Sequence, residues 1–181
     1  MTENTKKTGL SNIVSAAFDW VGAAVIALAI VSVIMTMFCR VVNVSGESMT
    51  NTLQPNERLI LSSVCMQPTY GDIVVIRREN DTPLIKRVIG LPGDKIYIND
   101  ATGIVYRNGE ALEEPYTRDG FTPSMGMVSA YEVPEGGIFV LGDNRRESLD
   151  SRRLKDQIRM SNVVGIVTFR LSPFESLRNG D

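Results

Sequence analysis

The most apolar stretch of the chain lies near its N-terminus. From Trp20 to Cys39, 20 consecutive residues carry no charged side chain, and most of them are Ala, Val, Ile or Met. A helix rises about 1.5 Å per residue, so this length spans roughly 30 Å, the hydrocarbon thickness of a bilayer. The pattern predicts a transmembrane helix over residues 20–39, preceded by a tail over residues 1–19.

A cleavable secretory signal is the competing interpretation, because Lys6 and Lys7 precede the apolar run. Such signals have apolar cores of about 7–15 residues, followed by small residues at a cleavage site. This run ends at Phe38-Cys39-Arg40, which offers no such site, so a retained anchor is favoured. Basic residues flank both ends, and the positive-inside bias slightly favours a cytoplasmic N-terminus.

After Arg40 the pattern changes to short runs rich in β-branched and aromatic residues, separated by turn residues. One further stretch, residues 151–160, has a weak helical period. A mainly β domain over residues 40–181 is therefore expected after the anchor. Its strands are predicted over residues 58–61, 72–76, 84–89, 95–98, 104–106, 138–141 and 163–169.

Residues 95–135 are expected to form a hairpin and an irregular excursion within this domain. Asn108-Gly109 is a good two-residue hairpin turn, because both residue types tolerate positive φ. Residues 113–130 contain prolines and glycines and few apolar runs, so we interpret them as an irregular segment outside the core.

Composition and charge narrow the possible chemistry. The 181 residues include 19 basic and 21 acidic side chains, which fits one compact domain and, without a long basic run, excludes nucleic-acid binding. Two cysteines, Cys39 and Cys65, cannot build a disulfide framework or a thiolate metal cluster. The chain has no histidine, which removes Ser-His-Asp and Cys-His activation and His-ligated zinc. A hydrolase with this composition needs another proton acceptor.

A first polar segment, Ser45-Gly46-Glu47-Ser48-Met49, follows the apolar run closely. Ser48 is nine positions past Cys39, so at about 3.3 Å per extended residue it lies within roughly 30 Å of the membrane exit. Such a stretch is also typical of a surface turn with capping hydroxyls, and both interpretations stay open.

A second segment, residues 83–94, places two cations in a predicted strand. Alternation puts Lys86 on the face of Leu84 and Val88, an apolar setting that would lower its pKa and allow it to act as a base. Arg87 alternates onto the opposite face. One of the two cations could therefore mark the solvated face, and periodicity does not say which.

A third segment, residues 140–153, is a dense polar stretch directly after an apolar strand. It contains Asp143, Ser148, Asp150 and Arg152. Composition alone fits either a solvated turn with salt bridges or a scaffold loop that orients a site.

In this order and behind an N-terminal apolar run, the three segments resemble the bacterial type I signal peptidases, or leader peptidases. Gly46-x-Ser48-Met49 resembles the nucleophile box, residues 86–94 the general-base box, and residues 142–152 the third box. The resemblance covers nearly the whole chain. Its short length and single span are closer to the Gram-positive form of the family.

The resemblance implies a mainly β, antiparallel catalytic domain of the signal-peptidase type behind a single transmembrane helix. It implies a membrane-bound serine endopeptidase that cleaves N-terminal signal peptides from exported preproteins at the outer face of the cytoplasmic membrane. Its partners would be preproteins and the lipid bilayer, with the secretion translocase nearby. The substrate is expected to dock as an extended strand on a sheet edge, and no metal or organic cofactor is expected.

The resemblance also implies residue roles. Ser48 is the expected nucleophile, with its backbone N–H helping to hold the oxyanion, and Lys86 is the expected general base. A serine without histidine needs such a deprotonated amine or a carboxylate nearby. The expected supporting residues are Ser148, which hydrogen-bonds and orients Lys86, Asp150 and Arg152, which form an ion pair, and Asp143, which braces the region through Arg87.

Two positions depart from the family pattern. Asn51 stands where the nucleophile box usually has proline, so the turn after Ser48 is expected to be less rigid. Gly46 stands where some members have a serine whose hydroxyl assists the oxyanion. The second oxyanion donor is therefore not identified by the sequence, and loss of one such donor costs roughly 10²–10³ in rate.

Three alternatives belong to other functional classes. A self-cleaving repressor uses a similar serine and lysine, but it would carry a DNA-binding domain in place of the apolar run. A membrane-anchored, non-catalytic β-domain would make Ser48 and Lys86 incidental, with Asn51 as a sign of lost activity. A specialised peptidase would cut only a few partner proteins.

Overall fold

The computed structural model describes residues 3–62, 67–79, 81–127, 129–154, 157–171 and 174–177. The chain divides into two compact units, Met1–Cys39 and Arg40–Asp181. Their elements, in chain order, are α1 (Glu3–Phe38), β1 (Cys39–Asn43), β2 (Arg58–Ser62), β3 (Ile73–Arg78), β4 (Asp81–Gly90), β5 (Lys95–Ile98), β6 (Val105–Arg107), β7 (Glu110–Ala111), β8 (Tyr131–Glu132), β9 (Phe139–Leu141), a 3₁₀ turn (Met160–Asn162), β10 (Val163–Leu171) and β11 (Phe174–Ser176).

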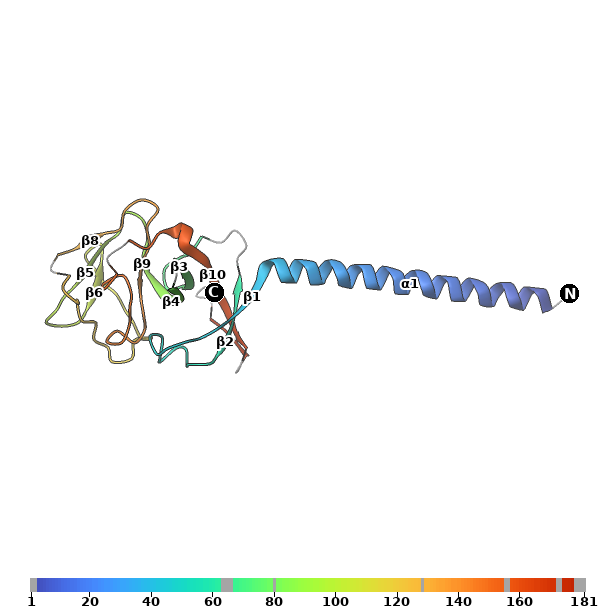
Figure 1. The fold of residues 1–181 in the computed structure, drawn as a ribbon, viewed down its shortest axis with the longest axis horizontal. Coiled ribbons are helices and arrows are strands. Elements are labelled where there is room, and N and C mark those ends of the chain that lie inside the picture. Colours follow the sequence, from blue (N-terminus) through green and yellow to red (C-terminus); the bar gives the residue numbers. More distant parts are fainter. Residues whose placement is uncertain are drawn as a thin grey trace. The chain divides into compact units, whose positions relative to one another are not determined.

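The N-terminal unit is the single helix α1 (Figure 1). Its segment Ala16–Ile34 is long and apolar enough to cross a membrane. The helix bounds differ from the predicted 20–39, because α1 begins at Glu3 and Cys39 already belongs to β1. A charge-free run marks where hydrocarbon can surround a helix, whereas residues such as Glu and Lys continue it readily.

The second unit is built on two antiparallel sheets, which confirms the mainly β fold class (Figure 1). In the part of the chain that the structure describes, the larger sheet has the strand order β1-β2-β10-β3-β4-β9, with β11 paired to β10. The smaller sheet has the order β7-β6-β5-β8. Each strand predicted from the sequence overlaps an observed one, and the added strands are short or lie next to α1 and the C-terminal end.

The central strand β3 of the larger sheet is buried on both faces over Ile73–Ile76. Ile73 and Val75 pack in one apolar cluster, whereas Val74 and Ile76 pack in the cluster on the opposite face. A strand that is covered on both sides needs apolar residues at every position, which explains the uninterrupted run Ile73–Ile76. A third cluster joins the two sheets and contains Ile89, Ile96, Ile98, Val105, Val133, Phe139 and Leu141.

The hairpin expected at Asn108-Gly109 joins β6 to β7, and both turn residues have positive φ, 55° and 88°. Residues 113–127, 129 and 130 form no regular element apart from turns and bends. The expectation that this excursion lies outside the core is wrong, because Thr122 and Ser124 are buried and Tyr116 packs against the third cluster. Polar contacts to the third box hold it there, and hydrophobic patterning does not report such contacts.

The helical interpretation of residues 151–160 is also wrong for the residues described there. Arg153 and Leu154 bond back to the Asp150 carbonyl and complete one turn. Ile158 then accepts a hydrogen bond from Ile138 N, and Arg159 forms a bridge with Gly137. Pairing with this neighbouring backbone overrides the weak helical period.

Candidate active site

Ser48 lies in a series of tight turns between β1 and β2. Thr50 N bonds to the Glu47 carbonyl at 3.0 Å, and Leu53 N bonds to the Met49 carbonyl at 2.8 Å. The side chains of Met49 and Leu53 are buried in the core, so they fix the turn from below. Ser48 itself is half-buried. The turn therefore presents one hydroxyl from a backbone that is anchored on both sides.

Lys86 faces this hydroxyl from β4. Its Nζ lies 2.6 Å from Ser48 Oγ and also donates to the Ile85 carbonyl at 2.8 Å. The side chain is almost fully buried, with 2% of the residue exposed. Burial disfavours the charged form and lowers the pKa of Lys86 to about 8, although the charges of Asp150 and Asp143 oppose the shift. Lys86 can therefore hold or release its proton near neutral pH.

Both cations of the general-base box are buried, so neither marks a solvated face. Arg87 forms a bidentate pair with Asp143, with Nε–Oδ1 at 2.9 Å and Nη2–Oδ2 at 2.7 Å. The exposed fractions of the two side chains are 5% and 0%. A planar guanidinium that meets a carboxylate in this way is stable in the interior, which alternation alone could not reveal.

The third box also holds the nucleophile turn. Thr52 Oγ1 donates to Asp143 Oδ2 at 2.5 Å. Asn144 N donates to the Ser48 carbonyl at 3.1 Å, and its side-chain amide bonds to the Glu47 carbonyl at 3.1 Å. Asp143 therefore connects the nucleophile turn to β4 through its contacts with Thr52 and Arg87.

Asp150 and Arg152 form a second buried ion pair. Arg152 Nη2 lies 2.8 Å from Asp150 Oδ2, and both side chains are fully buried. Burial by itself would raise the pKa of Asp150, but the hydrogen bonds and charge of Arg152 outweigh it and lower that pKa. Gly142 N also donates to the Asp150 carboxylate at 3.1 Å. The Asp150 carboxylate thus holds the two ends of the third box, Gly142 and Arg152, close together.

Ser148 is fully buried, but the expected hydrogen bond to Lys86 is not formed in the structure. Its Oγ has no hydrogen bond of good geometry, although it lies near enough to Asp150 to help lower the pKa of that carboxyl. A Cβ added at Gly142 would collide with Ser148 Oγ and with the Ser48 carbonyl. Ser148 therefore lies at the site, with its hydroxyl unsatisfied.

A cavity of about 200 Å³ opens beside the two candidate catalytic side chains. One side is lined by residues 44–46 with Met49, and the other by Arg78 and residues 82–86. In the described part of the chain, β9 pairs with β4 only at Arg87, Val88 and Gly90. Residues 83–86 of β4 are paired with no described strand on the side away from β3, along the cavity, and an extended chain can add there as a strand.

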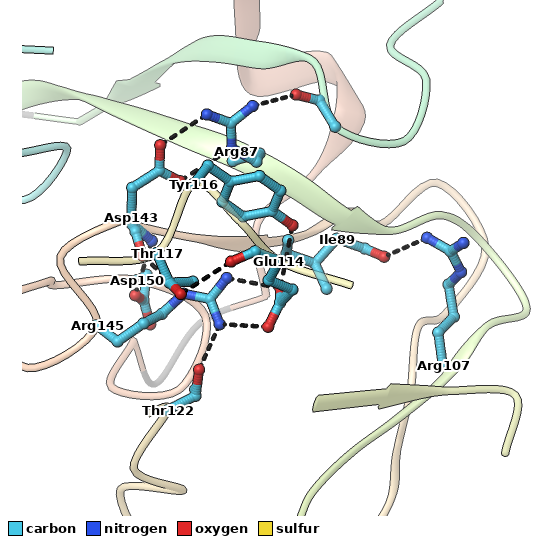
Figure 2. Close-up of polar contacts among 12 residues, drawn as sticks. Arg87, Ile89, Arg107, Glu114, Tyr116, Thr117, Thr122, Asp143, Arg145 and Asp150 are labelled. Carbon is cyan, nitrogen blue, oxygen red and sulfur yellow. Dashed lines mark hydrogen bonds and ion pairs between the residues drawn. The ribbon is translucent and has the colours of Figure 1, made fainter. Parts of the chain in front are cut away.

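A polar cluster that was not predicted from the sequence joins Glu114, Tyr116 and Arg145 to Arg87 (Figure 2). Arg145 pairs with Glu114, with Nη2–Oε1 at 2.7 Å and Nη1–Oε2 at 2.9 Å. The Tyr116 ring covers the guanidinium of Arg87, with Cζ 4.0 Å from the ring centroid. In the sequence, this cluster is indicated only by Glu114 and Tyr116, an acidic and an aromatic residue within a segment expected to be irregular.

The described residues contain no group of three or more His, Cys, Asp or Glu side chains that could hold a metal ion. The chemistry available is that of a serine beside a buried amine. A neutral amine at hydrogen-bond distance can take the proton of an alcohol as that alcohol attacks a carbonyl.

Comparison with known proteins identifies the class. The profile of the family "Signal peptidase, peptidase S26" matches residues 17–172. A signal peptidase I of Bacillus licheniformis is 35% identical, with 100% of both chains covered, and one of Bacillus caldolyticus is 40% identical over 73% of this chain and 79% of its own. A crystal structure of a signal peptidase I from Enterococcus faecalis aligns with a TM-score of 0.48 and 31% identity, covering 57% of this chain and 98% of that chain.

The chain belongs to the signal peptidase family S26. Members of this membrane-anchored family are serine endopeptidases that cleave signal peptides from preproteins, so the family and the activity expected from the sequence are confirmed.

Asp143→Asn tests the buried pair with Arg87. The substitution leaves a buried guanidinium without a counter-charge, so the free energy of unfolding should fall by about 3–5 kcal/mol. Glu132→Gln is the matched control, because its pair with Lys95 is exposed and contributes little. Denaturant unfolding of the full chain in detergent measures both. Equal stability of the two variants would contradict the assigned role of the pair.

Proposed function

We propose that this chain cleaves signal peptides with Ser48 as nucleophile and Lys86 as general base. The observation that carries the proposal is the 2.6 Å contact between Lys86 Nζ and Ser48 Oγ, with the amine almost fully buried. Burial makes the neutral amine accessible near neutral pH, and a chain without histidine has no imidazole to take this role.

In the first step, neutral Lys86 accepts the hydroxyl proton of Ser48 as Oγ attacks the carbonyl carbon of the last residue of the signal peptide. The backbone N–H of Ser48 donates to the developing oxyanion. The proton then passes from Lys86 to the leaving amine, and an ester remains between Ser48 and the signal peptide. Lys86 next takes a proton from water as the water oxygen attacks the ester carbonyl, and it returns this proton to Ser48 Oγ as the ester bond breaks and the signal peptide leaves.

The third box supports this chemistry in two ways. Asp143 fixes the nucleophile turn and β4 relative to each other through Thr52 and Arg87. Ser148 orients Lys86 through a hydrogen bond formed in the reacting state, a role supported by its full burial beside Gly142 and Asp150 and by a hydroxyl that makes no hydrogen bond of good geometry in the structure. The buried ion pair of Asp150 and Arg152 holds the backbone of the third box, which carries Asp143 and Ser148, in place.

The substrate binds as an extended strand along residues 83–86, with its main chain bonded to the edge of β4 that faces away from β3. The small volume of the cavity, about 200 Å³, favours small side chains next to the cleaved bond. Gly46 adds no side chain to this cavity wall, and its backbone φ of 84° suits glycine.

The chain is anchored in the cytoplasmic membrane by α1, with its N-terminus in the cytoplasm and residues 40–181 outside. Lys6 and Lys7 before the apolar stretch favour this orientation slightly over the reverse. Ser48 is only nine positions past Cys39, so cleavage takes place close to the bilayer and near the translocase that delivers preproteins.

Ser48→Ala should abolish cleavage of a preprotein because it removes the nucleophilic hydroxyl. Lys86→Arg should abolish it because a guanidinium does not lose its proton in proteins and cannot act as the base. In the unaltered chain, kcat/KM should rise about tenfold per pH unit up to a pKa near 8, as Lys86 becomes neutral. Lys95→Arg, at an exposed lysine, is the matched control and should retain full activity. Normal processing by either dyad variant would refute the mechanism.

The orientation is tested with an epitope tag at the N-terminus and a protease added outside intact cells or spheroplasts. Residues 40–181 should be degraded, whereas the tag should survive until the membrane is opened with detergent. A tag lost before permeabilisation, with residues 40–181 protected, would reverse the assigned topology.

A further inference from the structure

The irregular segment 114–123 contacts all three boxes, and we call it the brace. We propose that the brace, through Tyr116 and its partner Asn51, is a positioning element for the Ser48/Lys86 dyad. The inference rests on the proposed function and adds residues that the sequence did not identify. Each of the contacts described below joins the brace to a different box.

The first contact reaches the general-base box. The guanidinium of Arg87 binds the Asp143 carboxylate and also lies over the face of the Tyr116 ring, with Cζ 4.0 Å from the ring centroid (Figure 2). A cation over an aromatic face is attracted by the ring quadrupole, more strongly when water is excluded. Arg87 directly follows Lys86 in β4, so the ring limits movement of the strand that carries the base.

The second contact reaches the third box. Glu114 binds Arg145 by two hydrogen bonds, and the Tyr116 hydroxyl donates to Glu114 Oε1 at 3.1 Å. Arg145 Nε in turn donates to the Gly142 carbonyl at 2.9 Å. Burial raises the pKa of Tyr116, so its hydroxyl stays protonated and remains a donor at any pH at which the enzyme works. Arg145 is thereby fixed beside the Gly142 backbone.

The third contact reaches the nucleophile box. Asn51 Nδ2 donates to the Tyr116 carbonyl at 3.0 Å and lies 3.5 Å from the Thr117 carbonyl. The φ of Asn51 is 103°, which the ring of a proline cannot adopt. At the position where the family usually has proline, this chain therefore restrains the turn after Ser48 with a side-chain amide tied to the brace.

These contacts explain how an irregular segment can matter for chemistry. The dyad consists of side chains from two segments 38 residues apart, Ser48 and Lys86, and the brace contacts both segments. A shift of about 1 Å between catalytic groups can cost on the order of 10²-fold in rate. Loss of a brace contact should therefore lower kcat, whereas the cavity wall formed by residues 82–86 should keep KM near its normal value.

The test compares kcat and KM of full-chain variants in detergent on one preprotein. Asn51→Gly keeps the positive φ and removes only the amide, and Tyr116→Leu removes the ring face and the hydroxyl. Each should lower kcat by about ten- to a hundredfold with KM changed by less than about threefold. Tyr116→Phe keeps the ring over Arg87 and should recover most of the activity that Tyr116→Leu loses. Tyr97→Leu, at an exposed tyrosine, is the matched control and should behave as the unaltered chain.

A folded Asn51→Gly variant with normal kcat would overturn the proposal, as would a Tyr116→Phe variant no better than Tyr116→Leu. Thermal unfolding of each variant checks folding, and Asn51→Gly decides the question if Tyr116→Leu does not fold. Ser48→Ala, measured in parallel, separates the two hypotheses. Activity of Ser48→Ala refutes the dyad itself, whereas inactive Ser48→Ala with normal Asn51→Gly refutes the brace alone.

Discussion

The contact between the Lys86 amine and the Ser48 hydroxyl depends on a lysine that is removed from water without being paired to a carboxylate. In the described part of the chain, the two buried carboxylates whose charges act on Lys86 are Asp143 and Asp150, and each is bound by an arginine. A carboxylate in direct contact with the amine would hold its proton. Because arginines bind both carboxylates, burial has the largest effect on the pKa of the Lys86 amine.

This arrangement requires buried arginines that are themselves well held. Arg87 binds Asp143 and also lies over the Tyr116 ring, and Arg145 binds Glu114. Buried ion pairs of this kind contribute little net stability compared with apolar packing, but they are costly to break and fix geometry. In this chain, the buried ion pairs therefore act mainly by fixing the relative positions of the segments that they join. They add polar contacts between the nucleophile turn, β4, the brace and the third box.

The sequence predicted the sheet well because its core strands are apolar on both faces, as at Ile73–Ile76. The dyad was identified by motif order, not by physical pattern, and alternation could not show that Arg87 is buried. That burial depends on Asp143, 56 residues away, and periodicity carries no information on such pairing. The sequence also could not show that Ser148 makes no hydrogen bond to Lys86 in this structure, because the partner of a hydroxyl depends on how the surrounding backbone is placed.

The most direct test of this account is the pKa of Lys86 itself, measured without reference to catalysis. The full chain, labelled with ¹³C and ¹⁵N at the lysine side chains, can be titrated by NMR in detergent, with Lys86→Arg used to assign the signal. The account predicts a midpoint near 8 for this one lysine. A midpoint near 10.5, the value of an ordinary lysine, would mean that almost none of the amine is neutral near neutral pH and would contradict its assignment as the base.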